Sequence, residues 1–262
     1  MITRLQFTVS LPDGTQADAS WGYWLYSALL EQMPVEAAEW FHEQSFTPLS
    51  QYWLVDKPAH RACWRVSLLG DEAESLLLAP LEALSRLNLR ECAQPLAVSI
   101  EGCERYASQS EFWNRAAAMP DVPSHQLRIW TPASFKSGGR YVIFPEARLI
   151  LQNLVLRWNA IAPQCAISDE DALRMLEEKI SIRDYRLQTR RFLLKEQRIP
   201  GFSGQIWLQN RLPAPLMEIW KLLLLFADFA GAKKCGTGVK SWPRHTFFCA
   251  AAILVVQSLA AS

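Results

Sequence analysis

Glycine and lysine residues recur in one short segment near the C-terminal end of the sequence. The residues are Gly231, Lys233, Lys234, Gly236, Gly238 and Lys240. Glycines let backbone N–H groups approach a phosphate closely, and lysine ammonium groups attract its charge. The segment therefore predicts a site for a nucleic-acid backbone. The ordinary alternative is a glycine cap on the preceding helix followed by solvated lysines, and both interpretations can hold together.

The charges of the chain nearly cancel, at a net +1, but they are unevenly distributed. Residues 1–123 contain 8 Lys and Arg against 16 Asp and Glu, a net charge of −8, and residues 124–185 contain 8 against 7. Residues 186–244 contain 11 against 3, a net charge of +8. This asymmetry is expected of a protein that binds a polyanion with one end.

Familiar catalytic and metal-binding motifs are absent from the sequence. There is no HExxH and no CxxC pair, so we expect no metal and no cofactor. The glycine and lysine segment is not a P-loop, because Thr237 and Gly238 stand where Lys and Ser or Thr are required. Six irregularly spaced cysteines indicate reduced thiols in a cytoplasmic protein. The apolar run 249–256 is shorter than the roughly 20 residues of a membrane helix, so we expect no membrane contact.

Hydrophobic periodicity predicts an α+β protein made of two tandem ferredoxin-like modules. In the first module we expect strands at 5–11, 51–55, 62–68 and 96–100, and helices at 20–33, 35–42 and 71–88. In the second we expect strands at 126–131, 141–144, 185–194 and 202–209, and helices at 146–162 and 215–229. A proline-containing hinge at 119–124 separates module 1–118 from module 124–262.

Four groups of residues carry a family resemblance. They are 22–30 (GYWLYSALL); 40–43 (WFHE) with 46–50 (FTPLS); 131–136 (TPASFK) with 144–146 (FPE) and 157–159 (RWN); and 199–204 (IPGFSG) with 226–231 (FADFAG). In this order they are similar to segments of the CRISPR pre-crRNA-processing endoribonucleases, repeat-cleaving proteins of the RAMP superfamily. The similarity departs after Val239, and Lys233 stands where family members usually have a glycine.

The resemblance implies metal-independent cleavage of CRISPR repeat RNA. The RNA supplies its own nucleophile, a 2′-OH that attacks the adjacent phosphate and leaves a 2′,3′-cyclic phosphate and a 5′-OH. The protein must orient the sugar and phosphate and transfer protons. By position, His42 matches the catalytic histidine and Tyr26 a tyrosine used in some members. The alternative is that both side chains only pack within their helices. Gln44 and Ser45 follow the histidine where a catalytic lysine stands in some relatives.

The same resemblance assigns the second module to RNA binding, through the glycine and lysine segment. A predicted hairpin adds Arg190, Arg191, Lys195 and Arg198, which could follow the backbone of a repeat stem, and Lys136 is a further candidate. A solvated charged face is the alternative for these residues. The implied partner is repeat RNA or crRNA, bound by a monomer or a homodimer.

Two other functions remain open. A RAMP protein of this kind could hold crRNA within a CRISPR effector complex, together with other subunits, without cutting it. A tandem RRM-like RNA binder ranks last, because no exposed aromatic residues in an RNP pattern are evident in the sequence.

Overall fold

The computed structural model describes residues 1–13, 15, 17, 21–44, 46–90, 92, 94–137, 140–194, 197–231 and 254–258. They divide into two compact units, with the division between Ala107 and Ser108. Each unit contains an antiparallel sheet and its own helices. No helix among the described residues is long and apolar enough to cross a membrane.

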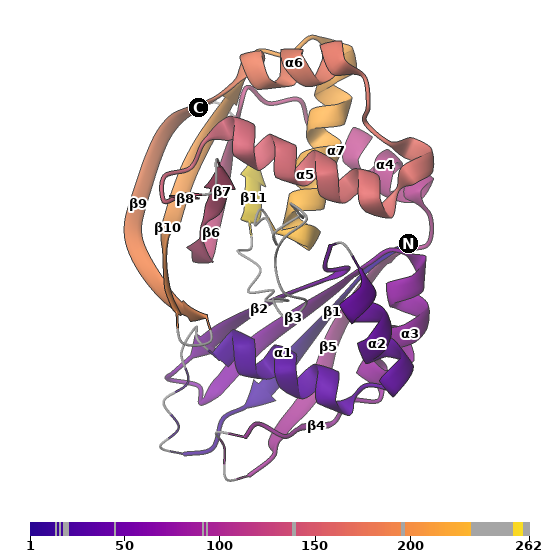
Figure 1. Ribbon diagram of the computed structural model, residues 1–262, viewed down its shortest axis with the longest axis vertical. Helices are drawn as coiled ribbons and strands as arrows, with labels where there is room; N and C mark the ends of the chain where they lie inside the picture. The colour runs from indigo at the N-terminus through magenta and orange to yellow at the C-terminus, as the bar shows by residue number, and fades with distance from the viewer. Residues whose placement is uncertain are drawn as a thin grey trace. The chain divides into compact units, whose positions relative to one another are not determined.

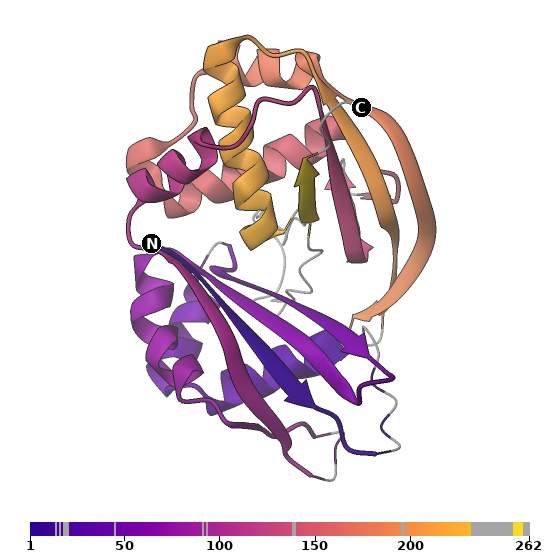
Figure 2. The ribbon, with the colours of Figure 1, turned by 180° about the vertical axis from the view of Figure 1, so that it is seen from behind.

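The first unit has the predicted ferredoxin-like order. Its elements are β1 (Ile2–Ser10), α1 (Trp21–Gln32), α2 (Val35–Glu43), β2 (Leu49–Asp56), β3 (Arg61–Leu69), α3 (Asp71–Glu82), β4 (Arg86–Leu87) and β5 (Leu96–Tyr106). The strand order is β2-β3-β1-β5-β4, with β1 antiparallel to both β3 and β5. Figure 2 shows the strands of this unit in front of its helices, which therefore cover one face of the sheet.

Alternation along β1 explains how this sheet acquires one buried face. Leu5, Phe7 and Val9 are fully buried, while the residues between them are partly exposed. Phe7 packs against Trp64 of β3 with ring centroids 5.2 Å apart. The predicted helix 71–88 is too long, because Arg86 and Leu87 leave it to pair with Ala97 and Leu96 of β5.

The second unit repeats the ferredoxin-like order. Its elements are α4 (Gln109–Ala117), β6 (Ser124–Ala133), β7 (Phe135–Ser137), β8 (Arg140–Val142), α5 (Ala147–Ile161), the 3₁₀ helix η1 (Pro163–Cys165), α6 (Glu170–Lys179), β9 (Ile180–Leu194), β10 (Gln197–Asn210), α7 (Ala214–Ala230) and β11 (Leu254–Ser258). The main sheet has the order β11-β6-β10-β9. Figure 1 shows β9 and β10 as a long, curved hairpin. The fold class predicted from the sequence is confirmed.

An aromatic cluster forms the centre of the second unit. Trp158 of α5 contacts Phe226 of α7 at 5.5 Å and Phe112 of α4 at 5.9 Å between ring centroids. Phe112 also meets Phe229 edge to face at 5.6 Å. Pairs of this geometry stabilise a fold beyond the apolar area that they bury. The cluster explains why α4 belongs to the second unit.

The segment that the sequence suggested as a hinge is held firmly by the second unit. Lys221 of α7 donates hydrogen bonds to the carbonyl oxygens of Ala117 and Met119, and it pairs with Asp121 at 2.8 Å. Asn210 donates its side-chain amide to the Val122 carbonyl at 2.9 Å. The division between the units therefore lies before α4, earlier than the boundary expected at residues 119–123.

Candidate nucleic-acid interface

Gly231 ends α7 and begins the segment predicted to bind phosphate. Its φ of 71° lies in the left-handed region that favours glycine, and its N–H donates to the Ala227 carbonyl at 2.9 Å. The predicted helix cap is therefore confirmed. The other candidates of this segment, Lys233, Lys234, Gly236, Gly238 and Lys240, lie outside the described residues.

Arg157 fixes this end of α7 from the neighbouring helix α5. Its guanidinium is buried and donates to the carbonyl oxygen of Ala230 and, at 3.1 Å, to that of Gly231. A cation at a helix C-terminus satisfies unpaired carbonyls and opposes the negative end of the helix dipole. The residue lies in the RWN segment of the sequence, but its function there was not recognised from sequence.

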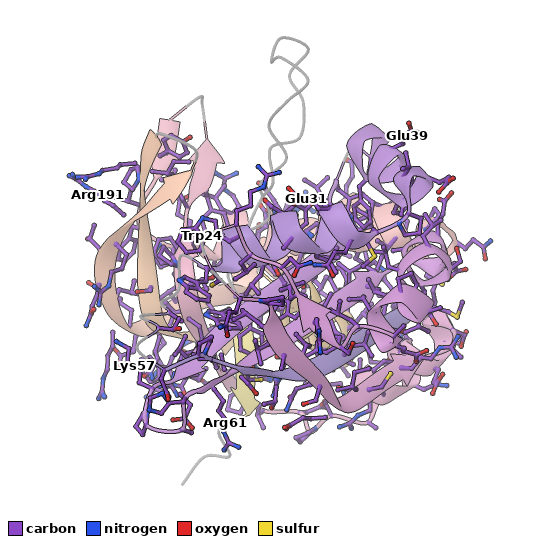
Figure 3. The ribbon with its side chains drawn as sticks, turned by 90° about the horizontal axis from the view of Figure 1, so that it is seen from below. Trp24, Glu31, Glu39, Lys57, Arg61 and Arg191 are labelled. Carbon is purple, nitrogen blue, oxygen red and sulfur yellow. The ribbon has the colours of Figure 1, made fainter. Side chains whose placement is uncertain are left out.

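The β9–β10 hairpin presents arginines to solvent. Arg190, Arg191 and Arg198 are all exposed, and Figure 3 shows Arg191 extending away from the hairpin. Arg190 donates to the side chain of Gln188 at 2.7 Å. Of the remaining candidates, Lys195 lies outside the described residues, and Lys136 belongs to β7 with its side chain outside them.

Gly204 gives the hairpin its shape. Its φ is 132°, and a Cβ atom there would lie 2.1 Å from the backbone oxygen of Arg186 on β9. The register of β10 against β6 shifts between Phe202 and Gly204, so the glycine permits a bulge at this point. The last glycine of the IPGFSG segment is thus explained by strand packing.

The two catalytic candidates lie on successive helices of the first unit. His42 belongs to the last turn of α2, with its side chain outside the described atoms. Tyr26 belongs to α1 and is 5% exposed. Burial of this phenol agrees with the packing alternative, while its catalytic function stays a prediction. Figure 3 shows Trp24 and Glu31 on α1 and Glu39 on α2.

Two other histidines have clear environments. His60 lies in the exposed turn between β2 and β3, and its Nδ1 is 3.6 Å from a carboxylate oxygen of Asp13. His125 of β6 is fully buried beside Trp220, and burial lowers the pKa of its imidazole to about 4. A neutral, enclosed imidazole cannot reach a substrate, so His125 belongs to the core.

The open faces of the two sheets differ in charge pairing. On the first, Arg4 forms an ion pair with Glu104 at 2.5 Å, and Arg65 donates to Gln6 at 2.8 Å. On the second, Arg128 lies over the Trp130 ring at 3.9 Å and Arg186 lies 5.8 Å from the Trp207 centroid. Within the part of the chain that the structure describes, neither of these two arginines has a carboxylate within salt-bridge distance.

Comparison with known proteins gives a consistent result. The family model for the CRISPR-associated endoribonuclease Cas6 matches residues 127–239. A Cas6 endoribonuclease of Streptococcus thermophilus is 28% identical over 87% of this chain and 91% of its own length. The Cas6 endoribonuclease of Mycobacterium tuberculosis is 25% identical over 90% of this chain and 74% of its own.

The fold agrees with solved structures as well. A Cas6 product complex superposes with a TM-score of 0.73 at 20% identity, covering 98% of this chain and all of that one. At this identity the similarity concerns the fold, and it covers both ferredoxin-like units. In sequence and in fold, this chain is similar to CRISPR-associated Cas6 proteins, in agreement with the family that its residues predicted.

Proposed function

We propose that this chain is an endoribonuclease that cleaves CRISPR repeat RNA. The observation that carries the proposal is the similarity to proteins named as Cas6 endoribonucleases along nearly the whole chain. The basic stretch at residues 186–244, with 11 Lys and Arg against 3 Asp and Glu, supports RNA as the substrate.

The proposed reaction uses a nucleophile from the RNA itself. The 2′-OH next to the scissile phosphate loses its proton, attacks in line and expels the 5′-oxygen of the next nucleotide. The products are a 2′,3′-cyclic phosphate and a 5′-OH. Because attack is intramolecular, the protein needs to orient the reacting groups, accept one proton and donate another, and no metal ion is required.

His42 is the proposed proton-transfer group. An unperturbed imidazole titrates near neutral pH and can serve as acid or base. Tyr26 is a weaker candidate, because its phenol is buried and would have to become accessible when RNA binds. With no lysine directly after His42, we expect slow turnover.

The basic candidates of the second unit are proposed to hold the substrate. Phosphate contacts from the segment after Gly231 and from Arg190, Arg191 and Arg198 would fix the repeat without reading its bases. Arg157 would act indirectly, by anchoring the carbonyls at which that segment begins.

A second candidate function is crRNA binding without cleavage, as a RAMP subunit of a CRISPR effector complex. The burial of Tyr26 and the missing lysine favour it, because both weaken the case for a complete set of proton-transfer groups. Both functions require that the chain binds RNA, and they differ only in whether the chain also cleaves it.

The test is cleavage of repeat RNA from the same genome by the full chain in excess EDTA. We expect continued cleavage, with a 2′,3′-cyclic phosphate on the 5′ fragment, and no cleavage when the scissile nucleotide carries a 2′-deoxy sugar. Loss of cleavage on chelation and its recovery with Mg²⁺ or Mn²⁺ would contradict the mechanism. Tight binding with no cleavage would favour the second function.

A further inference from the structure

The open face of the second unit's sheet carries tryptophans on its two central strands. Along β6, Leu127 and Ile129 are buried. Arg128, which lies between them, and Trp130, which follows Ile129, are half-buried. Along β10, Ile206 and Leu208 are buried and Trp207 between them is half-buried. Side chains alternate between the faces of a strand, so Trp130 and Trp207 lie opposite the buried face.

Strand pairing brings these residues together on one face. Gln205 of β10 pairs with Arg128 of β6 on one side and with Arg186 of β9 on the other. Trp207 pairs with Gln126 of β6 in the same way. Directly paired residues share a face, so two arginines, two tryptophans and two glutamines form one continuous surface.

Each tryptophan on this surface is accompanied by a guanidinium. Arg128 lies 3.9 Å from the Trp130 ring, and Arg186 lies 5.8 Å from that of Trp207. A base can stack on an aromatic ring or on the plane of an arginine guanidinium, so an arginine stacked on tryptophan extends the platform. The guanidinium keeps donors free at its edge for phosphate or base oxygens.

The charge of the surface favours an anionic ligand. Among the residues that the structure describes in this row, the carboxylate is that of Asp184 opposite Trp207, and it accepts a hydrogen bond from the Tyr185 backbone N–H at 2.7 Å. Gln126 and Gln205 add amides that can both donate to and accept from base edges. Aromatic faces, free arginines and amides together are the chemistry that recognises unpaired nucleotides.

We propose that this open face, formed by Arg128, Trp130, Arg186 and Trp207 with Gln126 and Gln205 between them, binds an unpaired stretch of RNA by base stacking. The proposal rests on the proposed function in one respect, that the RNA is the transcript that carries the repeat. The unpaired part of that transcript would bind to the sheet. The paired stem would bind to the β9–β10 hairpin and to the segment after Gly231.

The test measures binding of a short oligouridine and of a blunt-ended repeat stem by fluorescence anisotropy. Trp130→Ala with Trp207→Ala should weaken oligouridine binding at least about tenfold, since each stacked base contributes a factor of that order, and should leave stem binding unchanged. Arg128→Gln with Arg186→Gln should weaken it as well. Circular dichroism checks that each variant is folded. If the tryptophan variant does not fold, the arginine variant tests the proposal in its place.

Arg174→Gln with Arg211→Gln is the matched control, because it removes the same two charges from exposed positions of the second unit outside its strands. Unchanged oligouridine affinity in the folded arginine or tryptophan variants would overturn the proposal, as would an equal loss in this control. Failure of the proposed function would show differently, as a wild-type chain that neither binds nor cuts the repeat stem.

Discussion

The sheets of the two units share the ferredoxin-like strand order, and their open faces differ in how an arginine such as Arg4 or Arg128 is partnered. In the first unit, the arginines of the open face are engaged by neighbouring polar groups, as in the pair of Arg4 with Glu104. In the second unit, Arg128 and Arg186 lie over tryptophans and keep their charge unpaired among the described residues. A neutralised guanidinium offers little to a phosphate, whereas an unpaired one is available. The two units therefore have similar folds but different candidate functions. The first contains the proton-transfer candidates, and the second has a surface suited to binding RNA.

The largest expected effect belongs to the first unit. His42→Ala should lower the single-turnover rate of repeat cleavage by roughly 10²–10⁴-fold, the usual contribution of a general acid or base. Repeat affinity should change little, because one side chain adds little to an interface dominated by phosphates. Quench-flow or gel-based kinetics at saturating enzyme measures the rate. An unchanged rate in a folded variant would make His42 a packing residue of α2.

A second prediction concerns the arginine buried inside the second unit. Arg157→Met leaves the carbonyls of Ala230 and Gly231 without this donor, and each unsatisfied buried group costs about 1–3 kcal/mol. We expect the free energy of unfolding to fall by about 2–4 kcal/mol in urea denaturation. Arg148→Met, on the same helix but half-exposed and 3.7 Å from Glu146, should change it by less than about 0.5 kcal/mol. Equal effects would mean that Arg157 does not anchor α7.

Acid should weaken the second unit through His125. The pKa of its imidazole is about 4 in the folded chain, against about 6.5 in the unfolded chain. Between pH 6.5 and pH 4 this imidazole therefore binds a proton in the unfolded chain but not in the folded chain. Stability should therefore fall as the pH falls from 6.5 to 4, by up to about 3 kcal/mol for this group. His125→Leu should remove this dependence. The same pH slope in both proteins, measured by urea denaturation, would contradict the assignment.

A smaller effect is expected from the lysines after α7. Lys233→Ala with Lys234→Ala should weaken repeat binding and reduce its log–log salt slope by about one unit for each lost phosphate contact. Lys57→Ala, an exposed lysine of the first unit shown in Figure 3, is the matched control and should leave the slope unchanged. Identical slopes in all three proteins would mean that Lys233 and Lys234 are only solvated.

Much of the fold could be predicted from the sequence because hydrophobic periodicity was strong. The apolar helix α7 and the alternating strand β1 were expected close to their observed bounds. Helix α6 was missed because its short apolar group, of which only Leu176 is buried, stands within a polar stretch of the sequence. Its start depends on Asp169, whose carboxylate accepts from the N–H groups of Asp171 and Ala172.

The site was harder to predict than the fold. Strand pairing decides which side chains share a face, and it depends on bulges such as the one at Gly204 that periodicity does not reveal. The alternation from His125 to Trp130 was present in the sequence, but the partnership of Trp130 with Trp207 required the register. The resemblance to the family, in contrast, could be recognised from four short groups of residues, because their types and their order along the chain carry it without any knowledge of strand pairing.

The most direct test of this division of work is a crossed measurement on one repeat RNA. For wild type, His42→Ala and Lys233→Ala with Lys234→Ala, both the dissociation constant and the single-turnover rate at saturation are determined. We predict that the histidine variant loses rate and keeps affinity, while the lysine variant loses affinity and keeps its rate at saturation. If both variants lost the same quantity, chemistry and RNA grip would not be separated between the two units, and the central claim would be wrong.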